Sequence, residues 1–274
     1  MIFQQIHGVE VPALGFGTWQ LSGTTCRDAV ADALEIGYRH LDTARMYQNE
    51  EEVGRAIRES GLDRGDLFVT SKVWQDFLHR DDFITETEKS LSALGIDYLD
   101  LVLIHWPNLE VDVEETLDAM ASLQERGLLR HGGVSNFPPA LLERALRHYP
   151  VFCNQVEYYV LLGQEKLRAI CETHDVMLTA YCPLGQGEII DHEVLVAIGA
   201  AHGKSAAQVA LRWLLQQPKV TTVPRSSSPQ RRRENFDLFD FELSQAEMRQ
   251  IDDLPKDRRR SNPPFAPDWE MAAG

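Results

Sequence analysis

The feature that most constrains the fold is the alternation of strand-like and helix-like segments along almost the whole sequence. Eight apolar segments have the length of strands, and they lie near residues 14–18, 39–43, 67–73, 100–105, 130–135, 151–156, 177–182 and 221–224. Segments with helical spacing of apolar residues separate them, near residues 24–36, 49–60, 81–94, 113–127, 138–148, 164–174 and 205–216. Strands that alternate with helices pair in parallel, and this pattern is typical of a (β/α)8 TIM barrel.

Further segments lie outside the repeating pattern. Residues 2–13 predict an N-terminal β-hairpin with a turn at His7-Gly8, and residues 192–202 predict an extra helix in the seventh unit. A capping box that starts at Ser244 predicts a last helix near residues 244–253. The tail from Arg258 to Gly274 contains three prolines, and we expect it to cover one barrel end as irregular chain.

A doubly wound sheet is the competing α/β fold. It requires a Gly-x-Gly-x-x-Gly turn that leads from the first strand into a helix. The segment Gly15-Phe-Gly17 begins this motif, but Gln20 stands at the third glycine position and no helix starts there. We therefore favour the barrel. A chain of 274 residues suits one such domain, so we expect residues 1–274 to form a single domain.

The net charge and the hydropathy of the sequence limit which binding partners and which cellular location we expect for the protein. The formal net charge is −15 and the pI is about 5.0, which argues against nucleic acid and anionic membranes as partners. No apolar stretch approaches the roughly 18 residues of a membrane span. The first residues lack the charged start and long apolar run of a signal peptide, so we expect a cytoplasmic protein.

The cysteines do not indicate disulfides or a metal site. They show no C-x-x-C spacing and lie in apolar segments, at Cys26, Cys153, Cys171 and Cys182. Buried, reduced thiols fit this pattern best. The sequence also lacks a His-Glu-x-x-His motif, a Walker loop and a Gly-x-Ser-x-Gly turn. We expect no metal in the site.

Four polar residues lie at the ends of three predicted strands. Asp42 and Tyr47 follow the second strand, Lys72 ends the third, and His105 ends the fourth. The carboxyl ends of parallel strands meet on one face of a barrel, so these side chains should surround one small pocket. A phenol, an ammonium, a carboxylate and an imidazole can together protonate a carbonyl oxygen without a metal.

The chemistry of these groups suggests a role for each one. Tyr47 can donate a proton to a carbonyl oxygen while the carbon accepts a hydride. The ordinary pKa of tyrosine is about 10, and Lys72 should lower it by stabilising the tyrosinate. Asp42 can hold Lys72 as an ion pair, and His105 can orient the carbonyl oxygen by a hydrogen bond. Taken singly, the residues also fit structural roles, as a loop tyrosine, a core histidine and an ion pair.

Five segments in the same order resemble the patterns of the aldo-keto reductase family. They are Pro12–Trp19, Gly37–Ala44 with Tyr47–Glu50, Leu103–Pro107, Gly133–Phe137 and Pro224–Asn235. The resemblance extends along the whole chain, and it assigns the roles described above to the four polar residues. It also implies that a nicotinamide dinucleotide binds without a doubly wound sheet.

The resemblance implies further residues for the nicotinamide half of the cofactor. Ser135, Asn136 and Gln155 should bind the carboxamide, and Tyr181 should stack on the ring. Other candidate cofactor-binding residues are Thr18, Cys182 and Leu184. The family usually has serine at the position of Cys182, and a thiol is a weaker hydrogen-bond donor to a phosphate.

The segment from Arg225 to Asn235 should bind the adenosine half of NADPH. Backbone N–H groups at the start of a short helix can bind a phosphate. The matching family positions for the 2′-phosphate are Arg225, Ser226 and Arg231, and those for the adenine are Glu234 and Asn235. We expect Arg232 and Arg233 to form a solvated helix face. We expect Arg258–Arg260 to be solvated as well, although the position of the tail also allows these arginines to contact the substrate.

Three tryptophans beside the four polar residues should form the walls of the substrate pocket. They are Trp19, Trp74 and Trp106, although packing at the barrel rim explains Trp74 equally well. The segments after Pro107 and Pro183 are short for the family. We therefore expect an open pocket that accepts small carbonyl compounds and disfavours bulky steroid ketones.

The expected function is NADPH-dependent reduction of small aldehydes and ketones by a monomer. The tail resembles the family branch that reduces 2,5-diketo-gluconate and methylglyoxal, so keto-sugar acids and α-dicarbonyls are the expected substrates. Two alternatives remain at this point. One is a cofactor-sensing barrel subunit with little turnover, and the other is a barrel aldolase or isomerase that uses a lysine to form a Schiff base.

Overall fold

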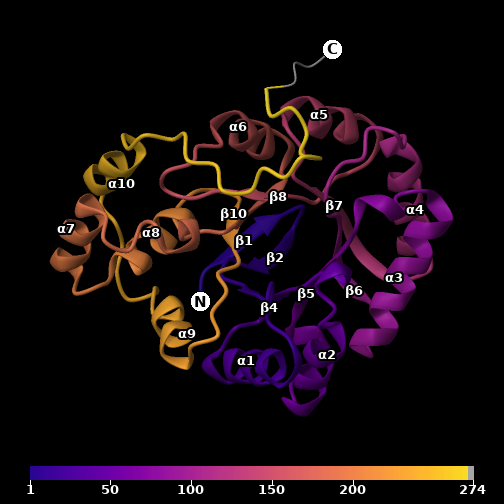
Figure 1. Ribbon diagram of the computed structural model, residues 1–274, viewed down its shortest axis with the longest axis horizontal. Helices are drawn as coiled ribbons and strands as arrows, with labels where there is room; N and C mark the ends of the chain where they lie inside the picture. Colours follow the sequence, from indigo (N-terminus) through magenta and orange to yellow (C-terminus); the bar gives the residue numbers. More distant parts are fainter. Residues whose placement is uncertain (271–274) are drawn as a thin grey trace.

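The computed structural model describes residues 1–270, and it confirms the predicted barrel. Eight parallel strands form one sheet in chain order from β3 to β10 (Figure 1). These strands are β3 (Phe16–Gly17), β4 (His40–Asp42), β5 (Phe68–Val73), β6 (Leu99–Ile104), β7 (Leu129–Ser135), β8 (Cys153–Glu157), β9 (Met177–Tyr181) and β10 (Val220–Thr222). Each predicted strand is present, with bounds that differ from the expected ones by a few residues.

Helices surround the sheet on its outer side (Figure 1). Those that connect successive strands are α1 (Gly23–Ile36), α2 (Glu50–Glu59), α3 (Arg80–Leu94), α4 (Val113–Glu125), α5 (Pro139–His148), α6 (Glu165–His174) and α8 (Ala206–Leu215). The additional helices are α7 (Glu193–His202), α9 (Pro229–Phe236) and α10 (Gln245–Asp252). Short 3-10 helices are η1 (Arg45–Tyr47), η2 (Arg64–Asp66), η3 (Gln75–Phe77) and η4 (Gly185–Gly187). The extra helix of the seventh unit and the capping box at Ser244 are both confirmed.

The barrel closes by pairing between its first and last strands. Leu14 and Thr222 form a parallel bridge, and the Gly15 N–H donates to the Thr222 carbonyl over 2.8 Å. A Cβ atom at Gly17 would lie 2.7 Å from the Val223 carbonyl oxygen, so only glycine allows this approach. The two glycines that begin a dinucleotide fingerprint therefore serve barrel closure.

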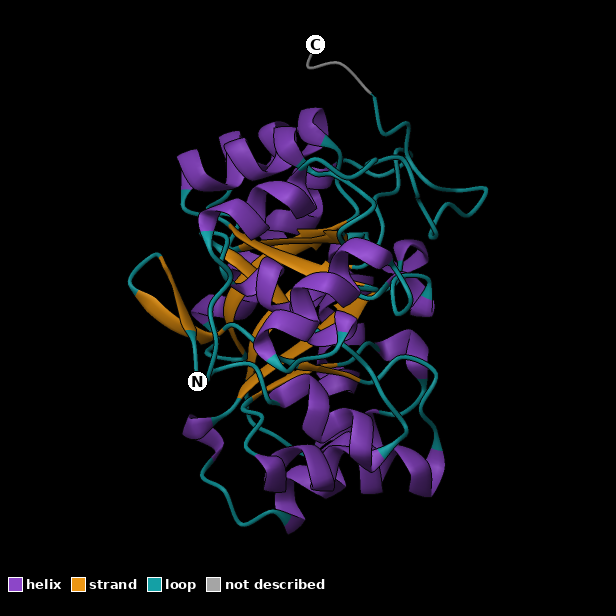
Figure 2. Ribbon diagram, turned by 90° about the vertical axis from the view of Figure 1, so that its left-hand side faces the viewer, coloured by secondary structure: helices purple, strands orange, loops and turns teal. Residues whose placement is uncertain are grey.

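The N-terminal hairpin seals the barrel end that lies away from the carboxyl ends of the strands. Its strands β1 (Phe3–Ile6) and β2 (Val9–Pro12) pair antiparallel through the predicted His7-Gly8 turn, where both φ angles are positive. Ile6 and Val11 are fully buried against a small cluster that includes Phe152. Figure 2 shows the hairpin at the opposite end of the molecule from the C-terminal tail.

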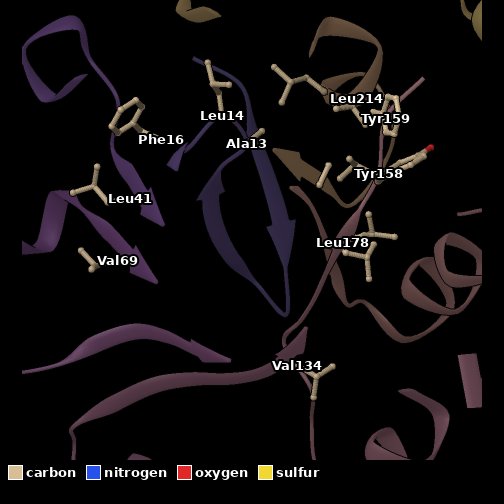
Figure 3. Close-up of a cluster of buried hydrophobic side chains, with 14 of the residues drawn as sticks. Ala13, Leu14, Phe16, Leu41, Val69, Val134, Tyr158, Tyr159, Leu178 and Leu214 are labelled. Carbon is tan, nitrogen blue, oxygen red and sulfur yellow. The ribbon is translucent and has the colours of Figure 1, made fainter. Parts of the chain in front are cut away.

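The main core lies between the strands and the ring of helices, as Figure 3 shows for one part of it. Leu41, Val69 and Leu178 are fully buried on barrel strands, and Leu214 is fully buried on α8. Within residues 1–270, no single helix is long and apolar enough to cross a membrane, and α7 and α8 reach that length only as a pair bent by 87°.

The irregular tail crosses the mouth of the barrel, as expected. The Arg258 N–H donates to the Leu161 carbonyl over 2.9 Å. Glu157, the last residue of β8, accepts N–H bonds from Arg260 over 2.8 Å and from Ser261 over 2.7 Å. A fully buried carboxylate thus attaches the tail to the sheet. Residues 271–274 of the predicted tail lie outside the described residues.

Candidate active site

The four candidate catalytic residues lie together at the carboxyl ends of adjacent strands. Asp42 ends β4, Tyr47 ends η1 directly after it, Lys72 is the fifth of the six residues of β5, and His105 follows β6. Parallel pairing of β4 with β5, and of β5 with β6, holds these strand ends side by side. The expected convergence on one face is therefore present.

Lys72 lies at the centre of this group, with only 1% of its surface exposed. Its ammonium donates to Asp42 Oδ1 over 2.6 Å, to the Thr43 carbonyl over 2.9 Å and to the Tyr47 hydroxyl over 3.4 Å. Burial by itself would lower the pKa of Lys72, but Asp42 and Tyr47 outweigh it and the pKa is raised. The side chain is therefore a fixed cation beside the phenol.

Lys72 acts to lower the pKa of Tyr47, as expected, but the sequence analysis left out burial. Burial outweighs the effect of Lys72, so the pKa of this phenol is raised. Burial disfavours the tyrosinate, whereas the cation at 3.4 Å favours it. Tyr47 consequently keeps its proton at neutral pH, as an acid must, and Lys72 reduces the energy required to release that proton.

His105 is an uncharged group beside the phenol. Its ring centroid lies 5.6 Å from that of Tyr47 and 5.2 Å from that of Trp74, with edge-to-face geometry in both pairs. Burial and then the charge of Lys72 lower the pKa of His105 well below its usual value. Neutral imidazole can donate one hydrogen bond to a carbonyl oxygen without bringing a second positive charge into the site.

The candidate nicotinamide residues form one hydrogen-bonded network that reaches Asp42. Gln155 Nε2 donates to Asp42 Oδ2 over 2.7 Å, and Ser135 Oγ donates to the Gln155 carbonyl over 2.8 Å. Asn136 Nδ2 donates to Ser135 Oγ over 3.1 Å, and the Tyr181 hydroxyl donates to Asn136 Oδ1 over 2.7 Å. These contacts fix the orientation of Tyr181 and link it to the Lys72–Asp42 ion pair.

The other candidate cofactor-binding residues at the barrel mouth, Thr18, Cys182 and Leu184, differ in exposure. Thr18 is fully buried, and its hydroxyl donates to the Asp42 carbonyl over 3.1 Å. Cys182 and Leu184 are half-buried after β9. Cys182 has a left-handed φ of 49°, and burial raises the pKa of its thiol to about 11, so it remains a neutral thiol. Cys182 and the three buried cysteines are all unpaired thiols.

The candidate adenosine site is the turn before α9 and its first residues. Arg225 is exposed and donates to the Trp19 carbonyl over 3.1 Å, and Arg231 is exposed on the first turn of the helix. Neither guanidinium forms an ion pair with a carboxylate among the described residues. Ser226 and Asn235 are each only 6% exposed, and Glu234 is exposed. Two cations without a counter-charge fit a phosphate.

The expectation that Arg232 belongs to a solvated face is wrong. This side chain is 4% exposed, and its Nε atom donates to Asp32 Oδ2 over 2.6 Å. Its Nη1 atom donates to the Ser226 carbonyl over 3.1 Å, so it joins α9 to α1 and holds the candidate phosphate turn. Arg233 is exposed as expected, with a second contact to Asp32 at 3.1 Å.

The three expected pocket tryptophans lie at the mouth, but the tail covers two of them. Phe265 packs edge-to-face on Trp74 at 5.5 Å and on Trp106 at 5.4 Å between ring centroids. Trp269 packs on Trp106 at 6.1 Å, which leaves Trp106 only 6% exposed. Trp19 remains 43% exposed.

Phe265 and Trp269 are wall residues that the sequence analysis missed. The short segments after Pro107 and Pro183 suggested an open pocket, whereas the tail supplies aromatic walls instead. An irregular, proline-containing segment has no periodicity from which side-chain direction can be read, so only its aromatic content could have indicated this role.

The residues that the structure describes contain no group of three or more histidine, cysteine or carboxylate side chains able to hold a metal ion. The site therefore consists of a buried ammonium–phenol pair, a neutral imidazole, an adjacent polar network and an aromatic wall. Such a site can polarise a carbonyl group and protonate its oxygen.

This barrel and site define an oxidoreductase class. The model of the aldo/keto reductase family matches residues 13–256, and the chain belongs to that family. Members of this family use nicotinamide cofactors.

Similar proteins include glyoxal reductase of Bacillus subtilis, which is 44% identical over 92% of both chains. The 9,11-endoperoxide prostaglandin H2 reductase of Trypanosoma cruzi is 41% identical over 97% of this chain and 96% of its own. A solved structure provisionally assigned as 2,5-diketo-D-gluconic acid reductase B has a TM-score of 0.96 at 40% identity, covering 99% of this chain and 98% of its own. The expected family and fold are confirmed.

Proposed function

We propose that this chain reduces small aldehydes and ketones to alcohols with NADPH, and that methylglyoxal and 2,5-diketo-gluconate represent its substrates. The observation that carries this proposal is the Tyr47 hydroxyl, which lies 3.4 Å from a buried ammonium that Asp42 holds in place. The names of the similar proteins support activated dicarbonyl compounds as the substrate class.

Each catalytic side chain has a defined task in the proposed reaction. NADPH, when bound, supplies the hydride. The Tyr47 hydroxyl donates its proton to the carbonyl oxygen, and Lys72 stabilises the phenolate that remains. Neutral His105 donates a hydrogen bond to the same oxygen and orients the carbonyl. Asp42 keeps Lys72 charged, which also disfavours a Schiff base because amine nucleophiles must be uncharged.

The proposed cofactor preference rests on the turn before α9. Arg225 and Arg231, which form no ion pair within residues 1–270, offer guanidinium groups to a 2′-phosphate. Ser135, Asn136, Gln155 and Tyr181 would hold the nicotinamide half. We also propose that residues 1–274 act as one domain and as a cytoplasmic monomer, since every proposed site residue comes from the same barrel and tail.

The test compares the wild type with Tyr47→Phe on a panel that contains methylglyoxal, 2,5-diketo-gluconate and a steroid ketone. NADPH oxidation is followed by absorbance, and NADPH binding is followed by fluorescence. We expect the variant to lose nearly all reduction while it binds NADPH as the wild type does, because only the proton donor is removed. Among wild-type substrates, the two dicarbonyl compounds should have the higher kcat/KM.

Two results would count against the proposal. Retention of most of the wild-type kcat by Tyr47→Phe would show that another group donates the proton. A higher kcat/KM for the steroid than for methylglyoxal would overturn the substrate class and leave the reductase chemistry in place.

A further inference from the structure

Three successive arginines in the tail have different surroundings. Arg258 and Arg260 are exposed, and each forms an ion pair with Glu188. Arg259 is half-buried and has no carboxylate partner among residues 1–270. Its Nη1 atom is shielded from solvent and also lacks a hydrogen-bond partner within that range. Glu157 and Glu270 compensate this charge only from beyond ion-pair distance. A partly buried cation without a direct partner is unfavourable, and an anion that reaches its exposed side would compensate it further.

The position of Arg259 connects it to the proposed catalytic group. Its guanidinium carbon lies 3.8 Å from the ring centroid of Trp269. Trp269 packs on Trp106, Trp106 packs on Phe265, and Phe265 packs on Trp74. Trp74 in turn lies 5.2 Å from His105. A continuous aromatic wall therefore leads from the carbonyl-orienting histidine to this guanidinium.

The backbone beside Arg259 is held firmly. Glu157 accepts the N–H groups of Arg260 and Ser261 at the carboxyl end of β8. The same carboxylate is fully buried and uses its oxygens for these bonds, so it forms no ion pair with the neighbouring guanidinium. Arg259 is thus a cation held at the mouth of the barrel, within the electrostatic influence of Glu157 and Glu270 but without an ion pair to either carboxylate.

We propose that Arg259 is the subsite for the carboxylate of keto-acid substrates. The planar guanidinium matches a carboxylate through paired hydrogen bonds, and the aromatic wall contacts the carbon chain between the carboxylate and the reacting carbonyl. This inference rests on the proposed reductase function and refines its substrate class. Substrates without a carboxylate, such as methylglyoxal, do not use this subsite.

The test uses Arg259→Met, with Arg258→Met as the matched control at the adjacent, exposed arginine. The substrates are methylglyoxal and a matched pair, a carboxyl-substituted benzaldehyde and its methyl ester. Arg259→Met should lower kcat/KM for the carboxylate by about ten- to a hundredfold, as expected for a charge-assisted hydrogen bond. It should change kcat/KM for the ester and for methylglyoxal by less than about twofold, and Arg258→Met should leave all three values unchanged.

Two further measurements test whether Arg259 binds the substrate carboxylate. Arg259→Lys should restore part of the activity on the carboxylate, because it keeps the charge but not the paired geometry. Binding of benzoate, followed by tryptophan fluorescence, should weaken in Arg259→Met and gives a readout that does not depend on turnover. Equal losses on the acid and the ester would overturn the subsite.

An increase in the KM for NADPH with an unchanged preference for the acid would instead assign the arginine to the cofactor diphosphate. A wild type that binds benzoate through Arg259 but reduces none of these carbonyls would contradict the proposed function and not the anion subsite.

Discussion

At the scale of single residues, the site depends on charges that are compensated at fixed distances. Lys72 is buried, and each oxygen of Asp42 has a separate donor, Lys72 on one side and Gln155 on the other. Removing one partner of a buried ion pair leaves an uncompensated charge and is strongly destabilising. The proposed proton donor and the candidate nicotinamide residues are therefore coupled through one carboxylate.

The proposed preference for NADPH over NADH also depends on single residues. We expect Arg231→Gln to weaken NADPH binding at least about tenfold, because one charge-assisted hydrogen bond to a phosphate contributes roughly 1.5–3 kcal/mol. NADH binding should stay nearly unchanged, and fluorescence titration measures both. Arg233→Gln on the same helix is the control, since Arg233 is exposed and contacts Asp32. Equal losses for NADPH and NADH would mean that Arg231 supports the fold only.

The surroundings of single residues were hard to predict from the sequence where their contact partners lie far away along the chain. Arg232 reads as one of three similar arginines on a short helix, and nothing local shows that Asp32 lies against it. The aromatic residues of the tail were missed for the same reason, because their partners lie on loops far earlier in the chain. Asp42, Tyr47, Lys72 and His105 could be placed, because parallel strands carry their carboxyl ends to one face.

At the scale of elements, the tail forms the outer wall of the site, and residues 258–270 do so without any helix or strand. Tail residues instead bind to the barrel through Glu157, through the Tyr159 hydroxyl that donates to the Arg258 carbonyl, and through Glu188. Backbone N–H groups bound to a buried carboxylate hold a segment more firmly than exposed ion pairs, which contribute about 0–1 kcal/mol.

We expect Glu157→Gln to loosen the tail. The variant keeps one acceptor oxygen but places an amide N–H group against backbone donors, so at least one bond to Arg260 or Ser261 is lost. Hydrogen exchange of residues 259–262 should become faster, and KM for the carboxyl-substituted aldehyde should rise. Glu188→Gln is the control, because Glu188 contacts the side chains of Arg258, Arg260 and Tyr159 but accepts no backbone N–H bond from the tail among residues 1–270. Unchanged exchange in Glu157→Gln would show that packing of Phe265 and Trp269 alone holds the tail.

The positions of strands and long helices were predicted from the sequence more accurately than the surroundings of single residues. Apolar periodicity located every barrel strand, because a strand buried on both faces forms a short apolar run between turn residues. The 3-10 helix that carries Tyr47 was not predicted. A three-residue element has too short a pattern to separate from a loop, although its position directly after β4 fixes where the phenol points.

At the scale of the whole molecule, buried histidines make the free energy of unfolding depend on pH. His40 is 1% exposed, and burial lowers its pKa despite the opposing charge of Asp42. Burial and then the charge of Lys72 lower the pKa of His105 well below its usual value. In the unfolded chain both bind a proton near the ordinary pKa of about 6.5. The unfolded state therefore gains protons as the pH falls through that value, and the folded state does not.

We expect the free energy of unfolding to fall as the pH is lowered from 7 to 5.5, a range above the ordinary pKa values of carboxyl groups. Each of these two histidines contributes a slope of up to about 1.4 kcal/mol per pH unit below 6.5. Urea unfolding at several pH values measures the slope. His105→Gln should reduce it, since glutamine does not titrate. The same slope in the variant and the wild type would show that His105 gains a proton in the folded state.

The pairing that closes the barrel also sets an order of events during synthesis on the ribosome. β3 is among the first strands to be made, but its outer edge stays unpaired until β10 emerges, because Leu14 pairs with Thr222. Domains complete their folding only after their last partner strands are available, and an unpaired strand edge can bind other chains in the meantime. The proposed proton donor Tyr47 is thus made early, whereas Phe265 and Trp269, which complete the aromatic wall, are made after every strand of the barrel.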